Sequence, residues 1–295
     1  ALMHADAELN KKTMDAELDA EPSCLADLND DLLRKIASRL AESDLASAVA
    51  LKRCSSRFKD LATPLVANAV SRINTKWRDA ADKIGMEGAA RIRGGLERNE
   101  VLTTLDLNFC YIRAECAAAI AEALRGNEVL TSLDVGVNNI GPTGATAIAE
   151  ALRVNGVLTS LNLSDNALCG VKFGRGSYDA SGIQALAEAL KVNGVLKTLT
   201  LPSNNIGDEG AKAIGGALAV NGVLTKLDLA RNGIDDAGAE ALASALRVNA
   251  VLKNLDLGEN EIGDEGAMAI GGTLAVNGVL TKLDLARNGI DDAGA

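Results

Sequence analysis

Residues 221–239 read NGVLTKLDLARNGIDDAGA, and the same 19 letters return at 277–295, which lie 56 positions further along the chain. Weaker copies start at positions that all hold asparagine, at intervals of 28 residues except for one longer copy of 38. The starting positions are Asn99, Asn127, Asn155, Asn193, Asn221, Asn249 and Asn277, and the longer copy begins at Asn155. We therefore predict a repeat protein, whose function depends on an extended surface rather than on a single pocket.

Each copy follows the spacing L-x-x-L-x-L-x-x-N-x-I, as in Leu224, Leu227, Leu229, Asn232 and Ile234. Leucines two positions apart share one side of a short strand, because side chains alternate along a strand. After the isoleucine the period becomes helical, and small or branched side chains recur every three or four positions as a buried stripe. In this copy the predicted stripe is Ala237, Ala241, Leu242, Ala245 and Leu246. Each unit is therefore a strand, a turn, a helix and a return.

A single unit cannot cover its own apolar face, so successive units must stack with their strands side by side at roughly 4.8 Å. Helices are wider than strands, and this mismatch bends the stack with its strands on the inner side. The asparagine that ends each strand motif offers both a donor and an acceptor to the backbone of the turn. We predict that these residues form a ladder through the stack: Asn138, Asn166, Asn204, Asn232, Asn260 and Asn288.

These motifs resemble the leucine-rich repeat family, and the 28-residue period with helices such as A-x-A-I-A-x-A-L is similar to its ribonuclease-inhibitor-like class. The resemblance covers residues from about 84 to 295. It implies an α/β solenoid, a curved horseshoe with parallel strands inside and helices outside, which binds other proteins with its concave face. Two positions depart from the pattern: Cys110 replaces the asparagine of the first full copy, and Cys116 replaces the glycine at the start of its helix.

The composition divides the chain into three parts. We predict a flexible tail rich in Ala, Asp and Glu, then a small all-α module, then the repeat domain. Their predicted bounds are 1–24, 25–70 and 71–295. The repeat domain is expected to comprise an atypical first repeat at 71–98, full repeats over 99–276 and a truncated last repeat at 277–295.

The helical module resembles the F-box, a short helical module that docks on the adaptor of cullin-type ubiquitin ligases. The residues that carry the resemblance and would form this site are Leu28, Leu32, Ile36, Leu40, Leu45, Phe58 and Leu61. The usual Leu-Pro opening is here Leu28-Asn29, which departs from that family. The alternative is a helical cap that only shields the open end of the first repeat, as solenoids require.

The third full copy holds ten extra residues, which we place at about 169–181, between a strand and a helix. Insertions at one edge of a solenoid become loops on that edge, often the binding edge. The loop contributes four candidate partner-binding residues, Lys172, Phe173, Arg175 and Tyr178, and the first full copy adds Phe109 and Tyr111. Aromatic side chains near arginine often anchor protein interfaces. The alternative for them is local packing of the loop on a neighbouring repeat.

Between the two strand leucines, every copy has one residue that points to the inner face. These residues are predicted to form a column: Asp106, Asp134, Asn162, Thr200, Asp228, Asp256 and Asp284. Stacked like charges repel, which favours an acidic surface for a basic segment of a partner. Alternatively, Asp is ordinary consensus at this position, and the neighbouring Lys226 and Lys282, also candidate partner-binding residues, relieve the repulsion.

Composition excludes several functions. The net charge of −10 argues against binding nucleic acid, and no apolar run is long enough to cross a membrane. The only histidine is His4 in the tail, so we predict no catalytic residues, no cofactor and no metal site. Five scattered cysteines indicate a reducing compartment, and we expect a cytoplasmic protein unless a targeting segment was removed before Ala1.

The sequence predicts a non-enzymatic protein that binds a protein partner through the concave face and the inserted loop. One form of this function is the substrate-recognition subunit of a cullin-type ubiquitin ligase, with the helical module on the adaptor. The alternative is a structural or linker subunit of a large multiprotein assembly. We expect that either further chain or a partner covers the last strand, which would otherwise present an open edge. Neither the partner nor the oligomeric state follows from the sequence.

Overall fold

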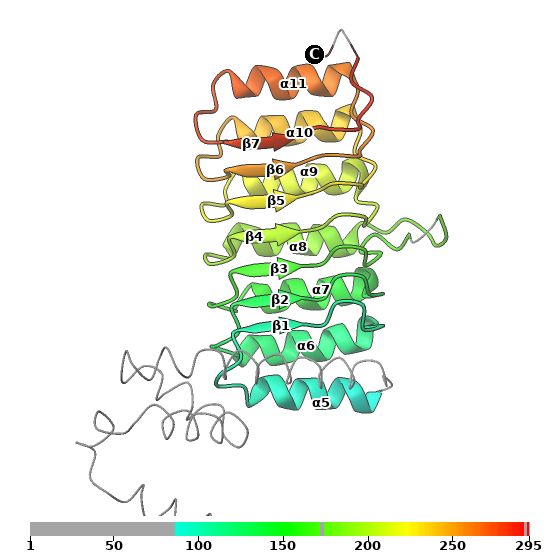
Figure 1. The fold of residues 1–295 in the computed structure, drawn as a ribbon, viewed down its shortest axis with the longest axis vertical. Coiled ribbons are helices and arrows are strands. Elements are labelled where there is room, and N and C mark those ends of the chain that lie inside the picture. Colours follow the sequence, from blue (N-terminus) through cyan, green and yellow to red (C-terminus); the bar gives the residue numbers. More distant parts are fainter. Residues whose placement is uncertain (1–85, 172–173, 292–293, 295) are drawn as a thin grey trace, which may run out of the picture. The chain divides into compact units, whose positions relative to one another are not determined.

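The computed structural model of the protein describes residues 86–171, 174–291 and 294. Helices and strands alternate along this part of the chain (Figure 1). The helices are α5 (Met86–Glu97), α6 (Ala114–Gly126), α7 (Gly141–Leu152), α8 (Ser181–Val192), α9 (Gly207–Leu218), α10 (Asp236–Leu246) and α11 (Asp264–Leu274). The strands are β1 (Thr104–Asp106), β2 (Ser132–Asp134), β3 (Ser160–Asn162), β4 (Thr198–Thr200), β5 (Lys226–Asp228), β6 (Asn254–Asp256) and β7 (Lys282–Asp284). The predicted tail and helical module, with all seven F-box-like residues, lie outside the described residues.

The seven described strands form one parallel sheet in chain order. Each strand pairs with the next so that equivalent leucines face each other, as Leu227 and Leu255 do. The helices lie together on one face of this sheet (Figure 1). This arrangement confirms the predicted α/β solenoid of stacked strand-helix units.

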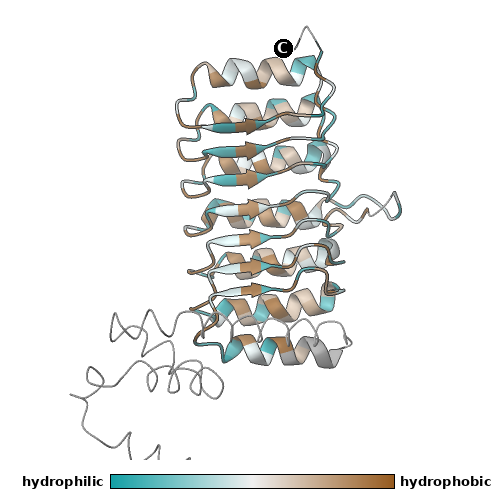
Figure 2. Ribbon diagram, in the orientation of Figure 1, coloured by the Kyte–Doolittle hydropathy of each residue, from teal (hydrophilic) through white to brown (hydrophobic). Residues whose placement is uncertain are grey.

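The core lies between the sheet and the helices. The central leucine of a strand is buried and its two neighbours are more exposed, as at Leu199 between Thr198 and Thr200. Figure 2 shows the same alternation as a hydrophobic centre between polar ends. The predicted stripe of α10 is wrong at Ala237, which is exposed, whereas Ala239 is buried. Because Asp235 caps α10 by accepting from the amide of Ala237, that residue lies in the first helical turn, on its solvent side.

The asparagine ladder is confirmed by hydrogen bonds between successive repeats. The side-chain amide of Asn232 donates to the carbonyl oxygens of Leu201 at 3.1 Å and Leu229 at 3.0 Å. Its Oδ1 accepts from the amides of Asn204 at 2.9 Å and Ile206 at 3.3 Å. One buried side chain therefore satisfies backbone groups in two repeats, which fixes the turn after each strand.

A second asparagine ladder occupies the positions that open the repeats, a role that the sequence analysis did not assign. Asn193 accepts from the amides of Val195 and Leu196, at 3.0 and 2.8 Å, through Oδ1. Its Nδ2 donates at 2.7 Å to the carbonyl oxygen of Leu152, the last residue of α7, which is the helix of the preceding repeat. Helix ends leave carbonyls without intrahelical partners, so this contact satisfies one of them and ties the end of each helix to the loop that follows the helix of the next repeat.

The inserted segment connects β3 to α8 and projects from the edge where strands lead into helices (Figure 1). Its two ends are joined where the amide of Asp179 donates to the carbonyl oxygen of Cys169 at 2.9 Å. A Cβ atom on Gly176 would lie only 2.1 Å from the carbonyl oxygen of Gly170. Only glycine at position 176 permits this close approach, which narrows the base of the loop.

The last described repeat is less covered than the others. Leu227 in β5 is 1% exposed, while its counterpart Leu283 in β7 is half-buried. Leu274, the last residue of α11, is 39% exposed, and Val276, which follows this helix, is 71% exposed. Within the described chain β7 pairs with β6 alone, which leaves its other edge open.

Candidate functional site

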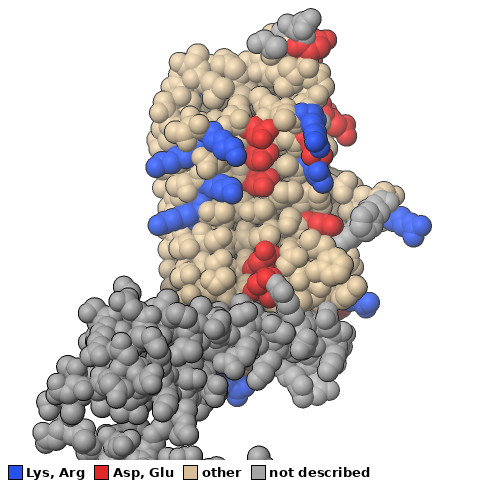
Figure 3. All heavy atoms as spheres, in the orientation of Figure 1, with Lys and Arg blue, Asp and Glu red and all other residues tan. Residues whose placement is uncertain are grey.

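The seven residues predicted to form a column on the sheet face do stand in register. Asp228 pairs with Asp256 and Asp256 with Asp284, and the same register continues back to Asp106 through Thr200. The described helices cover one face of the sheet (Figure 1), and a column of acidic side chains is visible on the other face (Figure 3). The column is therefore a continuous surface feature built from residues up to 178 positions apart in the sequence.

Most members of this column also have a structural role. Asp256 Oδ1 accepts from the amide of Gly258, two residues further on, at 3.0 Å. Asn162 makes the equivalent contact through its side-chain carbonyl. The exception is Thr200, which is followed two residues later by Pro202, a residue without an amide hydrogen. A side-chain oxygen that can accept is present wherever the residue two positions later has a backbone amide to donate. The turn therefore explains why Asp or Asn recurs at this position.

The two ends of the column differ in their polar surroundings. At the β1–β3 end, the side-chain amides of Asn108 and Asn162 donate to Asp134 at 3.3 and 3.0 Å. At the β5–β7 end, three carboxylates follow one another without an intervening asparagine. We call Asp228, Asp256 and Asp284 the acidic triad.

The environment of the acidic triad opposes ionisation at its first member. Burial raises the pKa of Asp228 above its ordinary value, and the charges of Asp256 and Asp284 raise it further. The hydrogen bond from the amide of Ala230 and the charge of Lys226 act in the opposite direction without cancelling this rise. A cationic group placed over the triad would relieve this unfavourable electrostatic interaction.

Lysines flank the acidic triad on the side where the strands begin. Lys226 and Lys282 are both exposed and stand in register with Asn254 between them. Lys197 and Lys253, which the sequence analysis did not select, precede β4 and β6 and are also exposed. In Figure 3 the lysines appear on the left of the red column, so the acidic triad is bounded by positive charge on this side.

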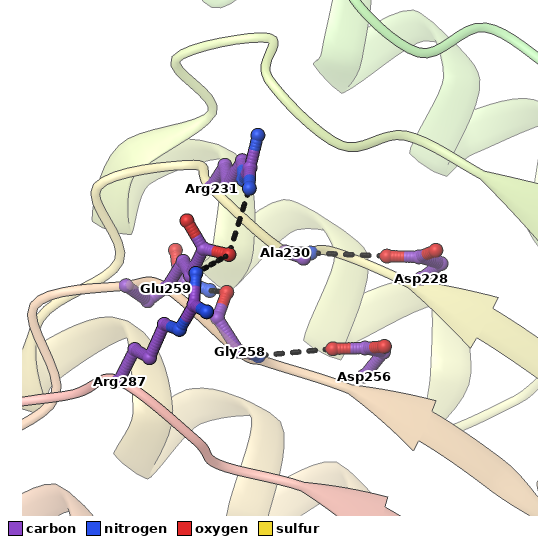
Figure 4. Close-up of polar contacts among 8 residues, drawn as sticks. Asp228, Ala230, Arg231, Asp256, Gly258, Glu259 and Arg287 are labelled. Carbon is purple, nitrogen blue, oxygen red and sulfur yellow. Dashed lines mark hydrogen bonds and ion pairs between the residues drawn. The ribbon is translucent and has the colours of Figure 1, made fainter.

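A charged cluster flanks the triad on the other side, where the strands end. Arg231 donates to Glu259 Oε1 at 2.8 Å, and Arg287 donates to the same oxygen at 3.0 Å. The two arginines lower the pKa of Glu259 by hydrogen bonding and by charge. Figure 4 shows this cluster beside Asp228 and Asp256. This cluster was not predicted from the sequence, although its three residues are spaced by one repeat and that period could have revealed it.

All three residues of this cluster have left-handed backbone conformations, with φ of 55° at Arg231, 56° at Glu259 and 59° at Arg287. Non-glycine residues rarely adopt such values. Here the conformation recurs at the same position of every described repeat, including Phe109 and Ser203. It is therefore a property of the turn that follows each strand.

The aromatic residues of the first full copy lie in the turn after β1. Phe109 and Tyr111 are 63% and 67% exposed, and their ring centroids are 5.9 Å apart. They flank Cys110, which is buried. The pair offers apolar surface at the opposite end of the stack from the acidic triad, and its role in binding stays a prediction.

In the inserted loop, Tyr178 contacts the next repeat. Its hydroxyl donates to the carbonyl oxygen of Ile206 at 2.8 Å, and burial is the main cause that raises its pKa to about 12. The side chain is still 45% exposed, and Arg175 is exposed as well. Lys172 and Phe173 lie outside the described residues. Tyr178 can therefore pack on the neighbouring repeat and still contact a partner, because nearly half of its surface remains accessible.

The acidic residues near the helix starts act as backbone acceptors. Asp208 Oδ1 accepts from the amide of Asp235, and Asp264 Oδ1 from that of Asp291, both at 2.9 Å. Over residues 86–171, 174–291 and 294, no group of three or more His, Cys, Asp and Glu side chains is placed to hold a metal ion. No helix of this part of the chain is both long and apolar enough to cross a membrane.

Comparisons with known proteins identify the repeated unit. A family described as "Leucine Rich repeat" matches residues 126–149, 192–215, 220–243, 248–271 and 276–295. No curated protein matches the sequence. A solved structure titled "Leiomodin-1 Actin-Binding Site 2 (ABS2)" is 20% identical over 63% of this chain and 87% of that chain, with a TM-score of 0.37. An internalin from Listeria monocytogenes is 16% identical over 70% of this chain and 90% of that chain, with a TM-score of 0.19.

Proposed function

We propose that this chain, a leucine-rich-repeat protein, is a non-enzymatic scaffold that binds another protein through the uncovered sheet face and the inserted loop. The observation that carries the proposal is the uncovered face itself. Purely parallel sheets normally have both faces covered by helices. Here the described helices cover one face, and the other presents charged and polar side chains (Figure 3). A partner that binds this face would supply the missing layer.

The charges of the sheet face suggest the chemistry of the partner. The acidic triad lies between the lysines at the strand starts and the Arg231–Glu259–Arg287 cluster at the strand ends. A basic segment of the partner would lie over the triad, and acidic groups on either side of that segment would face the flanking cations. Such alternation favours one register of binding over others, because a shift would bring like charges together.

Replacing the acidic triad by asparagine tests this function. In the variant Asp228→Asn, Asp256→Asn, Asp284→Asn the side-chain oxygens can still accept the backbone amides, as Asn162 does. The variant therefore removes charge without removing the turns. We expect affinity capture from lysate to recover a protein with the natural chain and to lose it with the variant, at a melting temperature no lower than that of the natural chain. Equal capture by both chains would contradict a role for the triad.

We further propose that the helical module of residues 25–70 docks on a ubiquitin-ligase adaptor, so that the repeat domain selects a target. The support is the F-box-like set of leucines in the sequence, and the test is whether capture with the full chain recovers cullin-ligase components. Replacing Leu32 and Ile36 by Asp should abolish their recovery and leave sheet-face partners bound. Recovery of stoichiometric partners of a stable particle, without ligase parts, would instead favour the structural or linker subunit.

We place the protein in the cytoplasm. The three described cysteines, Cys110, Cys116 and Cys169, are buried thiols that form no disulfide within the described residues. Free thiols are typical of reducing compartments, whereas secreted domains tend to form disulfides. Fractionation of cells that express the natural full-length protein tests the location, and recovery in a secreted or organellar fraction would contradict it.

A further inference from the structure

One edge of the solenoid has a composition that neither the sheet face nor the inserted loop explains. Five segments lead from a helix into the next strand: residues 153–160, 191–198, 219–226, 247–254 and 275–282. They contain seven basic residues and no Asp or Glu, in a protein whose net charge is −10. The seven are Arg153, Lys191, Lys197, Lys226, Arg247, Lys253 and Lys282, all exposed. We call these five segments the basic edge.

The basic edge also carries a row of exposed valines, one in each segment. Each precedes the asparagine that opens a repeat. Their exposed fractions are 60% at Val154, 58% at Val192, 65% at Val220, 65% at Val248 and 71% at Val276. A single exposed apolar residue is ordinary, but one at the same position of five consecutive repeats forms a continuous apolar row.

The second asparagine ladder, which includes Asn221, fixes the loops that carry this row. Beside Val220, Asn221 accepts from the amides of Val223 and Leu224, at 2.9 and 2.8 Å. Its Nδ2 donates at 2.6 Å to the carbonyl oxygen of Leu190 in α8, the helix of the preceding repeat. The loops are thus fixed before any partner arrives, which reduces the conformational entropy lost on binding.

Acidic groups adjoin the basic edge on two sides. On the strands, the acidic triad lies beside Lys226 and Lys282. On the helices, Glu150 and Glu188 lie near the ends of α7 and α8, and Glu188 pairs with Lys191. The last turns of α9, α10 and α11 contain no acidic residue, so on the helix side positive charge is least compensated over the segments from 219 to 282.

We propose that the basic edge docks an acidic segment of another protein, in which apolar side chains alternate with Asp and Glu. Its apolar side chains would cover the valine row while its carboxylates face the lysines and arginines. Charge complementarity selects this occupant. In a two-fold symmetric dimer through this edge, a second copy of the chain would bring one basic edge against another, and like charges would repel.

Two other anionic surfaces fit less well. Nucleic acids are bound by basic groups with aromatic side chains for base stacking, and the five segments contain no aromatic residue. Membrane-surface segments insert Trp, Phe or Leu from an amphipathic helix, whereas this row consists of valines at the last residue of a helix or in the short loops that follow helices. The valine row shares no residue with the acidic triad, although Lys226 and Lys282 border both surfaces. The two surfaces favour partner segments of opposite charge.

Selection of random peptides displayed on phage by the full-length protein tests the proposal. We expect enriched peptides to carry more Asp and Glu than Lys and Arg, together with apolar residues, and to bind more weakly as salt concentration rises. For a synthetic copy of the most enriched peptide, we expect the variant Val192→Ser, Val220→Ser, Val248→Ser to raise the Kd about tenfold or more. Because these valines are exposed, the melting temperature should stay unchanged.

The asparagine variant of the acidic triad is the matched control, and it should bind the acidic peptide at least as tightly as the natural chain does, because it removes negative charge beside Lys226 and Lys282. This control separates the basic edge from the proposed function, since the valine row and the acidic triad are each removed without the other. The proposal is overturned if no peptide is enriched, if enriched peptides lack an acidic excess, or if the valine variant binds equally well. It is also overturned if the natural chain binds phosphatidylserine vesicles, or associates with itself in sedimentation, and the valine variant loses that binding or association.

Discussion

At the scale of single residues, the identity of a side chain on the sheet face is coupled to the backbone two positions later. Asp and Asn occur where that residue has an amide to donate, and Thr200 occurs where Pro202 has none. The acidic column thus arises from turn chemistry before any question of binding. A surface charge can satisfy a structural requirement and remain available to a partner, since a carboxylate has a second oxygen.

Replacing Asp256 by Ala should lower the free energy of unfolding by about 1 kcal/mol, because the amide of Gly258 loses its acceptor. Thr200→Ala is the matched control at the same position of another strand. It should change stability by no more than about 0.5 kcal/mol, since no amide depends on that side chain. Urea denaturation measures both. A larger loss at Thr200 than at Asp256 would contradict the coupling.

Asp228→Asn should stabilise the protein at neutral pH. The folded-state pKa of Asp228 is raised by burial and by two neighbouring carboxylates. Because this pKa is raised, Asp228 contributes most favourably to folding stability below the ordinary Asp pKa of about 3.9. This contribution to stability is lost as pH rises through the folded-state pKa. At pH 7 the neutral amide is therefore preferred. We expect a higher melting temperature for the variant at pH 7 and a difference that shrinks as pH falls toward 4.

At the scale of elements, two asparagine ladders connect each strand-helix unit to its neighbours. One lies after the strands and includes Asn232, and the other lies before them and includes Asn193. Each side chain bonds to backbone groups of more than one repeat. The ladders explain how strands of only three residues form a regular sheet, because side chains supply hydrogen bonds that short strands cannot.

Asn232→Ala should cost about 3 kcal/mol or more, since backbone amides and carbonyls in two repeats would be left buried without partners. Asn288→Ala removes the equivalent residue of the last repeat, where the side chain is only half-buried. Water can replace its contacts there, so we expect a clearly smaller loss. Chemical denaturation of both variants provides the measurement, and equal losses would show that burial does not control the ladder's contribution.

At the scale of the whole molecule, stacking sorts charge onto separate surfaces. The segments that enter the strands carry only basic charges in the last five repeats, while acidic pairs such as Asp208-Glu209 and Asp264-Glu265 lie where the helices begin. The sheet face lies between these edges. One rigid repeat domain can therefore present surfaces of different charge to different partners.

The continuous core should protect its thiols from alkylation. Burial raises the pKa of Cys116 to about 11 and that of Cys169 to about 12. At pH 8 roughly one Cys116 thiol in a thousand is ionised, and only the thiolate reacts. We expect iodoacetamide to label both residues only in denaturant, in step with the loss of helical signal, as mass spectrometry of each peptide can measure. Rapid labelling of the native protein would contradict a sealed core.

The sequence by itself determined the solenoid, the register of its strands and the first asparagine ladder. Leucines two apart that recur every 28 residues have one arrangement that buries all of them. Burial of the motif leucines and of Asn232 follows from that arrangement. The sequence also predicted that the acidic residues form one column, because the direction of a side chain in a strand depends on its position along that strand.

The tertiary structure decided what the period alone could not. The buried face of α10 includes Ala239 rather than Ala237, because the cap at Asp235 fixes where the helix begins. The Arg231–Glu259–Arg287 cluster depends on left-handed turns that direct three side chains together. The basic edge exists only because stacking of the repeats brings basic residues spread over 153–282 to one side of the domain. Residues far apart in the sequence are close together there, and their charges act jointly.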